Sequence, residues 1–204
     1  TAQSGKRGVG RYTRHFAKAL VERAGSDEII LALNGAFADS ARELRSELLP
    51  FAGHDHIRTW SSHDFGQALY PEPAGLRQSN QVIRDNFLGS LEPDFLFHSG
   101  LFEGFDDFAQ TGVAKPGGNI PNGSMLHDLN PLKFPDLLAH PQVRSWYEGK
   151  LDDLRKAKLL FTMSEAVRQD AINLLELPAE RIVTIGAGVA PAFLKPALDG
   201  AQRC

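Results

Sequence analysis

Residues 158–188 read KLLFTMSEAVRQDAINLLELPAERIVTIGAG, and two short apolar runs flank a helical pattern in this stretch. The runs Lys158–Ser164 and Arg181–Gly188 predict buried strands. The apolar spacing between them predicts a helix over Glu165–Leu177. Because parallel strands need a crossover connection of this kind, the stretch indicates a parallel sheet covered by helices.

The same alternation runs through the rest of the chain. The sequence predicts further helices from Tyr12 to about Gly25, from Ser40 to about Leu49, over Leu76–Leu91 and over Val143–Ala157. The second of these would begin with a capping box at Ser40 and Glu43. Between the helices, the sequence predicts strands over Asp27–Asn34, His56–Ser61, Pro93–Ser99 and Ser124–Leu129. The expected fold class is therefore α/β, with helices on both faces of a mostly parallel sheet.

The composition is that of an ordinary globular chain. Its 204 residues are 42% hydrophobic, which suits one large domain or two small ones. A net charge of -3 gives no broad positive field, so we expect no nucleic-acid partner. The single cysteine, Cys204, fits a reducing compartment, and the apolar runs are too short to span a bilayer. We therefore expect a cytoplasmic protein.

A glycine-rich stretch, SGKRGVGRYTRHF, occupies Ser4–Phe16. Backbone N–H groups at a helix N-terminus favour an anion, and Lys6, Arg7 and Arg11 add positive charge, so this turn is a candidate phosphate site. The alternative is a tight turn with solvated cations. Such a turn normally follows the first strand of an α/β sheet, and Thr1–Ser4 are too few and too polar to form one. We therefore expect a strand upstream of this sequence.

Several nucleotide and hydrolase motifs are absent. The dinucleotide fingerprint fails because Thr13 stands where its third glycine belongs, and Asn34 lies where an acidic residue is expected. The G-x-x-x-x-G-K-[ST], G-x-S-x-G and H-E-x-x-H patterns do not occur. The sequence thus disfavours a nicotinamide cofactor and two large hydrolase classes.

A second candidate site begins at His127, where HDLNPLKFP follows a predicted strand. Ligands of open α/β sheets collect beyond the carboxyl ends of the strands, so an imidazole there can face a substrate. The alternative is a partly buried histidine held by Asp128 or by a backbone carbonyl.

Two other polar groups have simpler interpretations. Ser164 is a good N-cap for the following helix, and Glu165 suits its first turn. The HDH segment at His54–His56 lacks a clear third ligand nearby, so we expect exposed loop histidines and no metal site.

Taken in order, four segments resemble the N-terminal half of the retaining group 1 glycosyltransferases, which have the GT-B fold of two Rossmann-like domains. The segments are RGVGRYTRHFAKAL from Arg7, LFHSGLFEGF from Leu96, LHDLNPLKFP from Leu126, and LLFTMSEAVRQDAINLLELPAERIVTIGAGV from Leu159. Within this family, the chain is most similar to mannosyltransferases that build bacterial surface polysaccharides.

The resemblance implies a domain organisation. Residues 1–188 would form a Rossmann-like three-layer sandwich on the acceptor side of the cleft, and residues 189–204 would begin the interdomain linker. The C-terminal donor-binding domain would lie outside this chain. The family's donor-side pair of glutamates, separated by seven residues, does not occur here. We therefore expect this segment to be inactive alone.

The resemblance also implies site residues. Gly8, Val9 and Gly10 would approach the donor diphosphate, with Arg11 as a charge partner. His127 would lie beside the transferred sugar.

Three other residues complete the expected site. Asp128 would orient the loop that carries the family histidine. Ser164 and Glu165 would face the cleft, with no assigned chemistry.

The implied reaction is sugar transfer with retention. The donor would be a nucleotide sugar, the sugar mannose or another hexose, and the acceptor a saccharide or a lipid-linked saccharide of the cell surface. His127 would position and polarise the sugar without forming a covalent bond. We expect no cofactor and no metal-binding residues in this chain, and the metal dependence of the transfer stays open. Membrane contact stays open, at most as peripheral contact at the inner face.

Two other function classes remain open at this point. One is a non-catalytic α/β module that binds a small anion through the glycine turn. The other is a short-chain oxidoreductase, because Tyr147 and Lys150 resemble the catalytic pair of that class. Two residues separate them, whereas the class needs three.

Overall fold

A computed structural model describes residues 8–61, 75–105, 109–113 and 120–189. Lys6, Arg7 and most of the expected linker lie outside the described residues. No helix in the described ranges is both long enough and apolar enough to cross a membrane.

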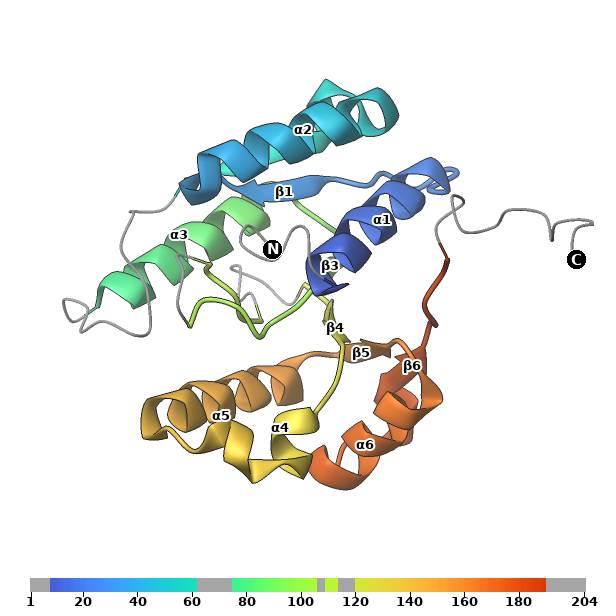
Figure 1. The fold of residues 1–204 in the computed structure, drawn as a ribbon. Helices are drawn as coiled ribbons and strands as arrows, with labels where there is room; N and C mark the ends of the chain where they lie inside the picture. Colours follow the sequence, from blue (N-terminus) through green and yellow to red (C-terminus); the bar gives the residue numbers. More distant parts are fainter. Residues whose placement is uncertain (1–7, 62–74, 106–108, 114–119, 190–204) are drawn as a thin grey trace, which may run out of the picture.

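The described residues form an alternating α/β chain (Figure 1). In order, the elements are α1 (Gly8–Glu22), β1 (Leu31–Asn34), η1 (Gly35–Phe37), α2 (Ala38–Ala52), η2 (His54–His56), β2 (Ile57–Trp60), α3 (Leu76–Ser90), β3 (Leu96–His98), β4 (Asn122–Leu126), α4 (Asn130–Lys133), η3 (Pro135–Leu138), α5 (Pro141–Lys156), β5 (Leu159–Thr162), α6 (Glu165–Leu175), η4 (Ala179–Arg181) and β6 (Ile182–Thr184).

All strand pairs are parallel, as predicted. β1 pairs with β2, and the other four strands form a sheet in the order β3-β4-β5-β6. Among the described residues, no backbone ladder joins the two-stranded sheet to the four-stranded one. The strand expected upstream of the glycine turn stays a prediction.

Helices cover both faces of the four-stranded sheet. Phe97 of β3 stacks on Phe16 of α1, with 5.2 Å between ring centroids. On the opposite face, Leu160 of β5 is fully buried in a cluster with Leu154 of α5 and Leu175 of α6. Figure 1 shows α1 on one side of this sheet and α5 and α6 on the other. The Rossmann-like three-layer arrangement is confirmed.

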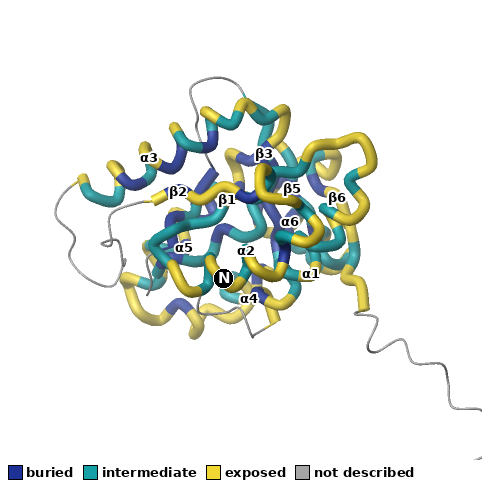
Figure 2. Tube along the Cα trace, turned by 90° about the horizontal axis from the view of Figure 1, so that it is seen from above, coloured by how far each residue is buried: buried dark blue, intermediate teal, exposed yellow. Residues whose placement is uncertain are grey.

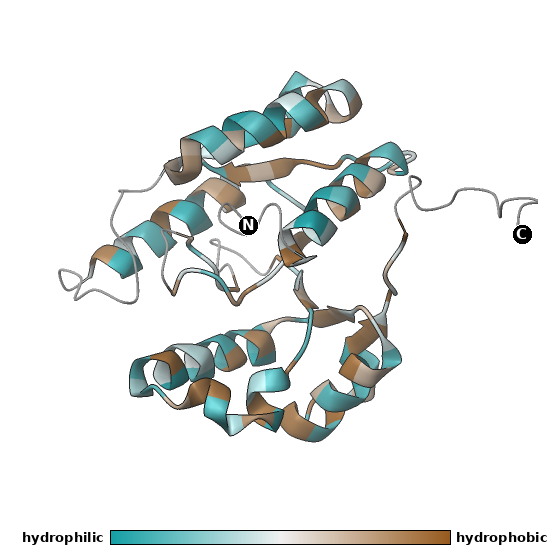
Figure 3. Cartoon of the chain, in the orientation of Figure 1, coloured by the Kyte–Doolittle hydropathy of each residue, from teal (hydrophilic) through white to brown (hydrophobic). Residues whose placement is uncertain are grey.

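The hydrophobic pattern explains this layering. In Figure 3 strands β1, β5 and β6 are largely hydrophobic, whereas the helices carry hydrophobic and hydrophilic residues on different sides. Figure 2 shows the buried residues gathered on the strands and on the inward sides of the helices. Because apolar area is buried on both faces, the sheet forms the centre of the core.

Two expectations about helix starts were wrong. α1 begins at Gly8, four residues before Tyr12, so the glycine turn is the first turn of the helix. α2 begins at Ala38, and Ser40 is not its cap. The Asn34 side chain instead accepts a hydrogen bond from the backbone N–H of Ala36 at 3.0 Å and caps η1, which continues directly into α2.

The strands are all shorter than their apolar runs. β1 begins only at Leu31, β3 covers three residues within Pro93–Ser99, and β6 covers three residues within Arg181–Gly188. Apolar runs report burial, whereas strand bounds depend on backbone pairing, so the sequence overestimates the length of each ladder.

His98 makes the stability of the fold depend on pH. Its Nε2 atom is buried without a hydrogen-bond partner among the described residues, and burial, together with the nearby charge of Arg84, lowers its pKa to about 3. The imidazole has a pKa of about 6.5 in an unfolded chain, so between these values the unfolded state binds more protons. Stability is therefore fully present above pH 6.5 and falls as the pH falls.

Replacing His98 removes this dependence. Between pH 7.5 and pH 5.5, we expect wild type to lose about 1.4 kcal/mol more of its free energy of unfolding than His98→Phe. Urea denaturation at both pH values measures the difference. The exposed His140 offers a matched control, and His140→Phe should keep the wild-type dependence. Equal losses in wild type and His98→Phe would contradict this assignment.

Candidate functional site

The carboxyl ends of four parallel strands meet at one edge of the sheet. Ser99 follows β3, His127 follows β4, Met163 follows β5 and Ile185 follows β6. The backbone N–H of Ile185 still bonds to the carbonyl of Thr162 at 2.9 Å, which keeps the last two of these segments together. This is the edge at which open α/β sheets bind ligands.

His127 lies at the centre of this edge. Its Nε2 atom is 3.3 Å from the carbonyl oxygen of Ser99, and its Nδ1 atom is 3.1 Å from the sulfur of Met163. The carbonyl oxygen and the thioether sulfur are both acceptors, and a neutral ring has one N–H, so it donates through Nε2 to the stronger acceptor, the Ser99 carbonyl. The Nδ1 atom of the neutral ring then has no proton and faces a flexible thioether.

The surroundings of His127 favour the neutral ring. Burial lowers its pKa, while the hydrogen bond to Ser99 and the charges of Asp128 and Glu103 raise it, and the lowering prevails. Near pH 7 the ring is therefore a neutral imidazole with an unprotonated nitrogen. Once Met163 moves aside, this nitrogen is able to accept a hydrogen bond from a hydroxyl group.

Helix α1 contacts His127 through Tyr12, one turn after the start of the helix. The Tyr12 ring meets the imidazole edge-on, with 5.6 Å between centroids and 89° between planes. Its hydroxyl donates to the carbonyl of Gly186 at 3.3 Å, which ties α1 to the segment after β6. The candidate phosphate residues Gly8, Val9, Gly10 and Arg11 form the turn just before Tyr12. The structure thus brings the start of α1 to the edge that carries His127.

Asp128 organises the turn after His127. Its exposed side chain accepts a hydrogen bond from the backbone N–H of Asn130 at 3.0 Å, at the start of α4. At the other end of α4, Lys133 donates to Asp170 of α6 at 2.7 Å. The Asp128 side chain therefore closes the turn that directly follows His127.

Ser164 caps α6 as predicted, because its hydroxyl accepts the N–H of Val167 at 3.3 Å. The Glu165 carboxylate accepts from Gln169 at 2.7 Å, from Arg168 at 3.0 Å and from the Thr184 hydroxyl at 3.2 Å. The hydrogen bonds from Gln169 and Arg168 lower its pKa. Glu165 is therefore a structural tie between α6 and β6.

Sequence reasoning missed Ser99, Tyr12 and Met163 as neighbours of His127. Ser99 and Met163 directly follow strands, so their places at strand ends were the available signal. Tyr12 was assigned only to the apolar face of the first helix.

Other candidates do not form sites. The HDH histidines lie in η2, where His56 is 3.5 Å from Glu28, and no group of three metal-binding side chains occurs in the described part of the chain. Tyr147 and Lys150 are both buried in α5, and the Lys150 ammonium is bonded to Thr111. This pair does not face an open site, so the oxidoreductase interpretation loses its basis.

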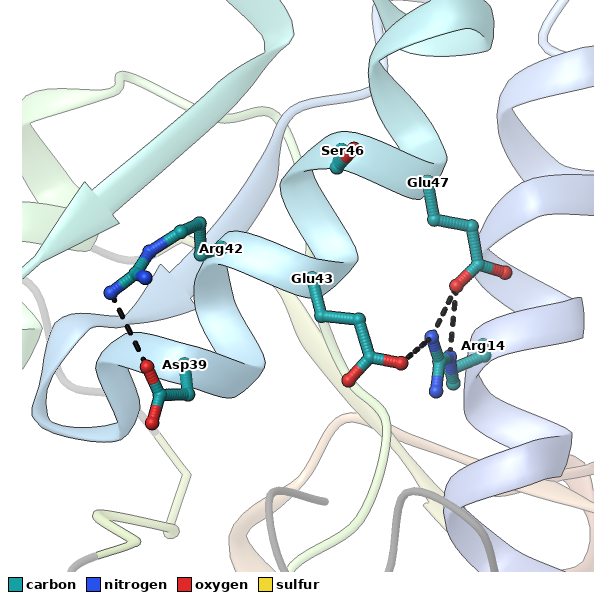
Figure 4. Close-up of a pocket in the computed structure, with 6 residues that line it drawn as sticks. All are labelled: Arg14, Asp39, Arg42, Glu43, Ser46 and Glu47. Atoms are coloured by element: carbon teal, nitrogen blue, oxygen red, sulfur yellow. Dashed lines mark hydrogen bonds and ion pairs between the residues drawn. The ribbon is translucent and has the colours of Figure 1, made fainter.

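A surface hollow between α1 and α2 is also unrelated to this edge (Figure 4). Arg14 forms ion pairs with Glu43 and Glu47 across it, and Arg42 pairs with Asp39 at 3.3 Å. Its two arginines face three carboxylates, so the hollow has a net negative charge and offers no anion site.

Comparison with known proteins assigns the chain to a family. The family model of Glycosyltransferase Family 4 matches residues 6–193. The chain belongs to glycosyltransferase family 4. It is similar to two proteins from Escherichia coli, each called "Serotype-specific mannosyltransferase WbdA", at 24% identity over 196 residues and 23% over 182. These matches cover 94% and 87% of this chain.

The family 4 domain spans less than a quarter of those relatives, because the matched parts are 23% and 22% of their lengths. No solved structure gave a significant match. The membership agrees with the parallel sheet and with the resemblance drawn from the sequence.

The cap of α6 is testable. Ser164→Ala removes the acceptor of the Val167 N–H, and loss of an N-cap side chain costs about 1 kcal/mol. Urea denaturation should show this loss of stability. Ser46→Ala is the matched control, because Ser46 is exposed inside α2, where alanine is favourable. Equal stabilities of Ser164→Ala and wild type would contradict the capping role.

Proposed function

We propose that this family 4 domain forms the acceptor side of an enzyme that transfers mannose from a nucleotide sugar with retention. The acceptor is a saccharide or a lipid-linked saccharide of a cell-surface polysaccharide. The names of the two relatives support mannose as the sugar. The observation that carries the proposal is a neutral His127 at the ends of the parallel strands, one helical turn from the glycine-containing start of α1.

In this proposal, His127 contacts the transferred sugar. Its Nε2–H is held by the Ser99 carbonyl, so Nδ1 is the nitrogen that meets a sugar hydroxyl after Met163 moves. A neutral ring accepts this hydrogen bond, whereas an imidazolium does not. The fixed tautomer orients the sugar beside the bond that breaks.

The donor diphosphate lies at the start of α1. Gly8, Val9 and Gly10 supply backbone N–H groups in the first turn, where the helix dipole favours negative charge. Arg11 adds a cation at the same turn. These groups stabilise the charge that develops on the departing diphosphate.

Retention then needs no protein nucleophile. Two carboxylates of this edge are already engaged, since Asp128 holds the Asn130 N–H, and Glu165 binds side chains of α6 and β6. The acceptor hydroxyl therefore attacks from the face that the diphosphate leaves, and the diphosphate oxygen takes its proton. No cofactor takes part in this step.

The rest of the donor site belongs to a second domain of the GT-B type. In this proposal residues 1–188 are the acceptor-side domain, and residues 189–204 begin the linker. The nucleotide and most of the sugar are held by the second domain, so the present segment does not turn over alone.

The role of His127 is testable in the full-length protein. With a panel of GDP-, UDP- and ADP-sugars, one donor, GDP-mannose first, should support transfer, and His127→Ala should lower kcat/KM about a hundredfold. The loss follows from the missing sugar contact. His140→Ala removes an exposed histidine and should leave the rate unchanged.

Two outcomes would contradict this proposal. Full activity of a folded His127→Ala variant would remove His127 from the sugar site. No transfer and no nucleotide binding across the panel would favour the alternative, a non-catalytic module that binds a small anion.

The diphosphate site makes a separate prediction. Arg11→Gln should raise the KM for the donor about tenfold, since a charge-assisted contact to phosphate is lost. Arg42→Gln is the control, because Arg42 pairs with Asp39 in the unrelated hollow. An unchanged KM in Arg11→Gln would show that Arg11 does not bind the donor diphosphate.

A further inference from the structure

The segment that follows β3 is tightly packed against α5. We call its described residues, 99–105 and 109–113, the β3 loop. Leu101 is fully buried in the main core, and the Phe102 ring stacks on Tyr147 of α5 with 4.9 Å between centroids. Phe105 packs on Trp146 of α5 at 5.4 Å. One side of α5 is therefore occupied by this loop.

A buried ammonium group joins the two limbs of the β3 loop. Lys150 of α5 donates to the Thr111 carbonyl at 2.6 Å and to the Thr111 hydroxyl at 2.8 Å. The hydroxyl oxygen lies 2.7 Å from the carbonyl of Leu101 and 2.9 Å from that of Glu103. Because the hydroxyl accepts from Lys150, its own proton points to these carbonyls. These hydrogen bonds thus connect α5 to residues 109–113 of the β3 loop, and these residues to residues 99–105.

Other contacts close the β3 loop around this connection. Arg84 of α3 donates to the Gly112 carbonyl at 2.6 Å. A Cβ atom at Gly112 would lie 3.0 Å from a carboxylate oxygen of Asp153, and one at Gly104, which has a φ of +88°, would lie 2.2 Å from the Ala109 carbonyl. The two parts of the loop therefore touch each other and both helices, and at Gly104 there is no room for a larger residue.

Packing alone does not explain a lysine here. Lys150 is only 8% exposed, and burial lowers its pKa to about 8. An apolar side chain of similar length would fill the same space without desolvating a charge. What the ammonium adds is a set of directed donors for Thr111, so its distinctive contribution is to fix the loop.

The β3 loop begins at the residue that holds the candidate site histidine. Ser99 supplies the carbonyl 3.3 Å from His127 Nε2, and the charge of Glu103 raises the pKa of His127. Any shift of the loop would therefore change both the tautomer and the burial of the imidazole.

We propose that Lys150 is a positioning residue for His127, because its bonds to Thr111 fix the β3 loop and thereby the Ser99 carbonyl against the imidazole. Lys150 does not touch the substrate. Its effect on the imidazole is independent of the reaction, and only its effect on sugar transfer rests on the proposed function.

The first test measures His127 itself in the full-length protein. Hydrogen exchange at the ring carbon of each histidine, followed by mass spectrometry, gives the pKa and accessibility of each imidazole. In Lys150→Met we expect faster exchange at His127 and a pKa raised by about half a unit or more, as the ring loses its cover. Arg155→Met removes an exposed cation of the same helix that pairs with Asp152, and it should change neither value.

A second pair of variants keeps the lysine. Thr111→Val removes the bridging hydroxyl at nearly constant shape and should move the His127 pKa in the same direction. Thr111→Ser keeps the hydroxyl and should retain the wild-type value. If Lys150→Met does not fold, the two Thr111 variants test the proposal without it. An unchanged His127 pKa in folded Lys150→Met, or in folded Thr111→Val, would overturn the proposal.

Kinetics separate this inference from the proposed function. In the full-length enzyme, Lys150→Met should lower kcat about tenfold and leave the donor KM within about twofold, because the donor contacts are intact. If Lys150→Met shifts the pKa of His127 but leaves kcat unchanged, Lys150 has no role in sugar transfer. If wild type transfers no sugar from any donor, the proposed function fails, and the exchange measurement still tests the link between Lys150 and His127.

Discussion

Parallel pairing of β3, β4, β5 and β6 is the constraint on which the rest of the structure depends. It ends all four strands at one edge, so the residues that follow them share a small region although they are far apart in sequence. Ser99, His127 and Met163 are in contact only because their strands are in register. A shift of one strand by one residue would turn its following side chain to the opposite face of the sheet.

The first helix reaches this edge through a row of aromatic rings. Tyr12 stacks on Phe16, Phe16 on Phe97, and Phe97 meets Phe161, with centroid distances of 5.9, 5.2 and 5.5 Å. Each aromatic pair contributes about 0.5–1.5 kcal/mol beyond the area it buries. These ring contacts fix the position of α1 along the strands. They therefore also set where the first turn of α1 lies relative to His127.

Much of this arrangement could be predicted from the sequence. The order of helices and strands, the Ser164 cap and the place of His127 at a strand end all follow from local patterns. The start of α1 at Gly8 could not be predicted, because glycine disfavours helices. Likewise, only the fold brings Thr184 within hydrogen-bond distance of Glu165, nineteen residues earlier in the chain.

Lys150 illustrates the limit of pattern reasoning more sharply. Its spacing from Tyr147 resembled a catalytic pair, yet both side chains point into the core. A spacing on a helix fixes which side chains share a face. What that face packs against is decided by residues elsewhere, here by Thr111 and Phe102 of the β3 loop.

The packing of the β3 loop also gives the protein an optical reporter. Its two tryptophans are Trp60 and Trp146. Trp146 lies against Phe102 and Phe105, with the Lys150 ammonium 5.9 Å from its ring, whereas Trp60 lies in the separate sheet of β1 and β2. A charge moving near an indole shifts its emission wavelength. The intrinsic fluorescence of Trp146 should therefore respond to the loop in solution without any added dye, once Trp60→Phe removes the overlapping emission of the other indole.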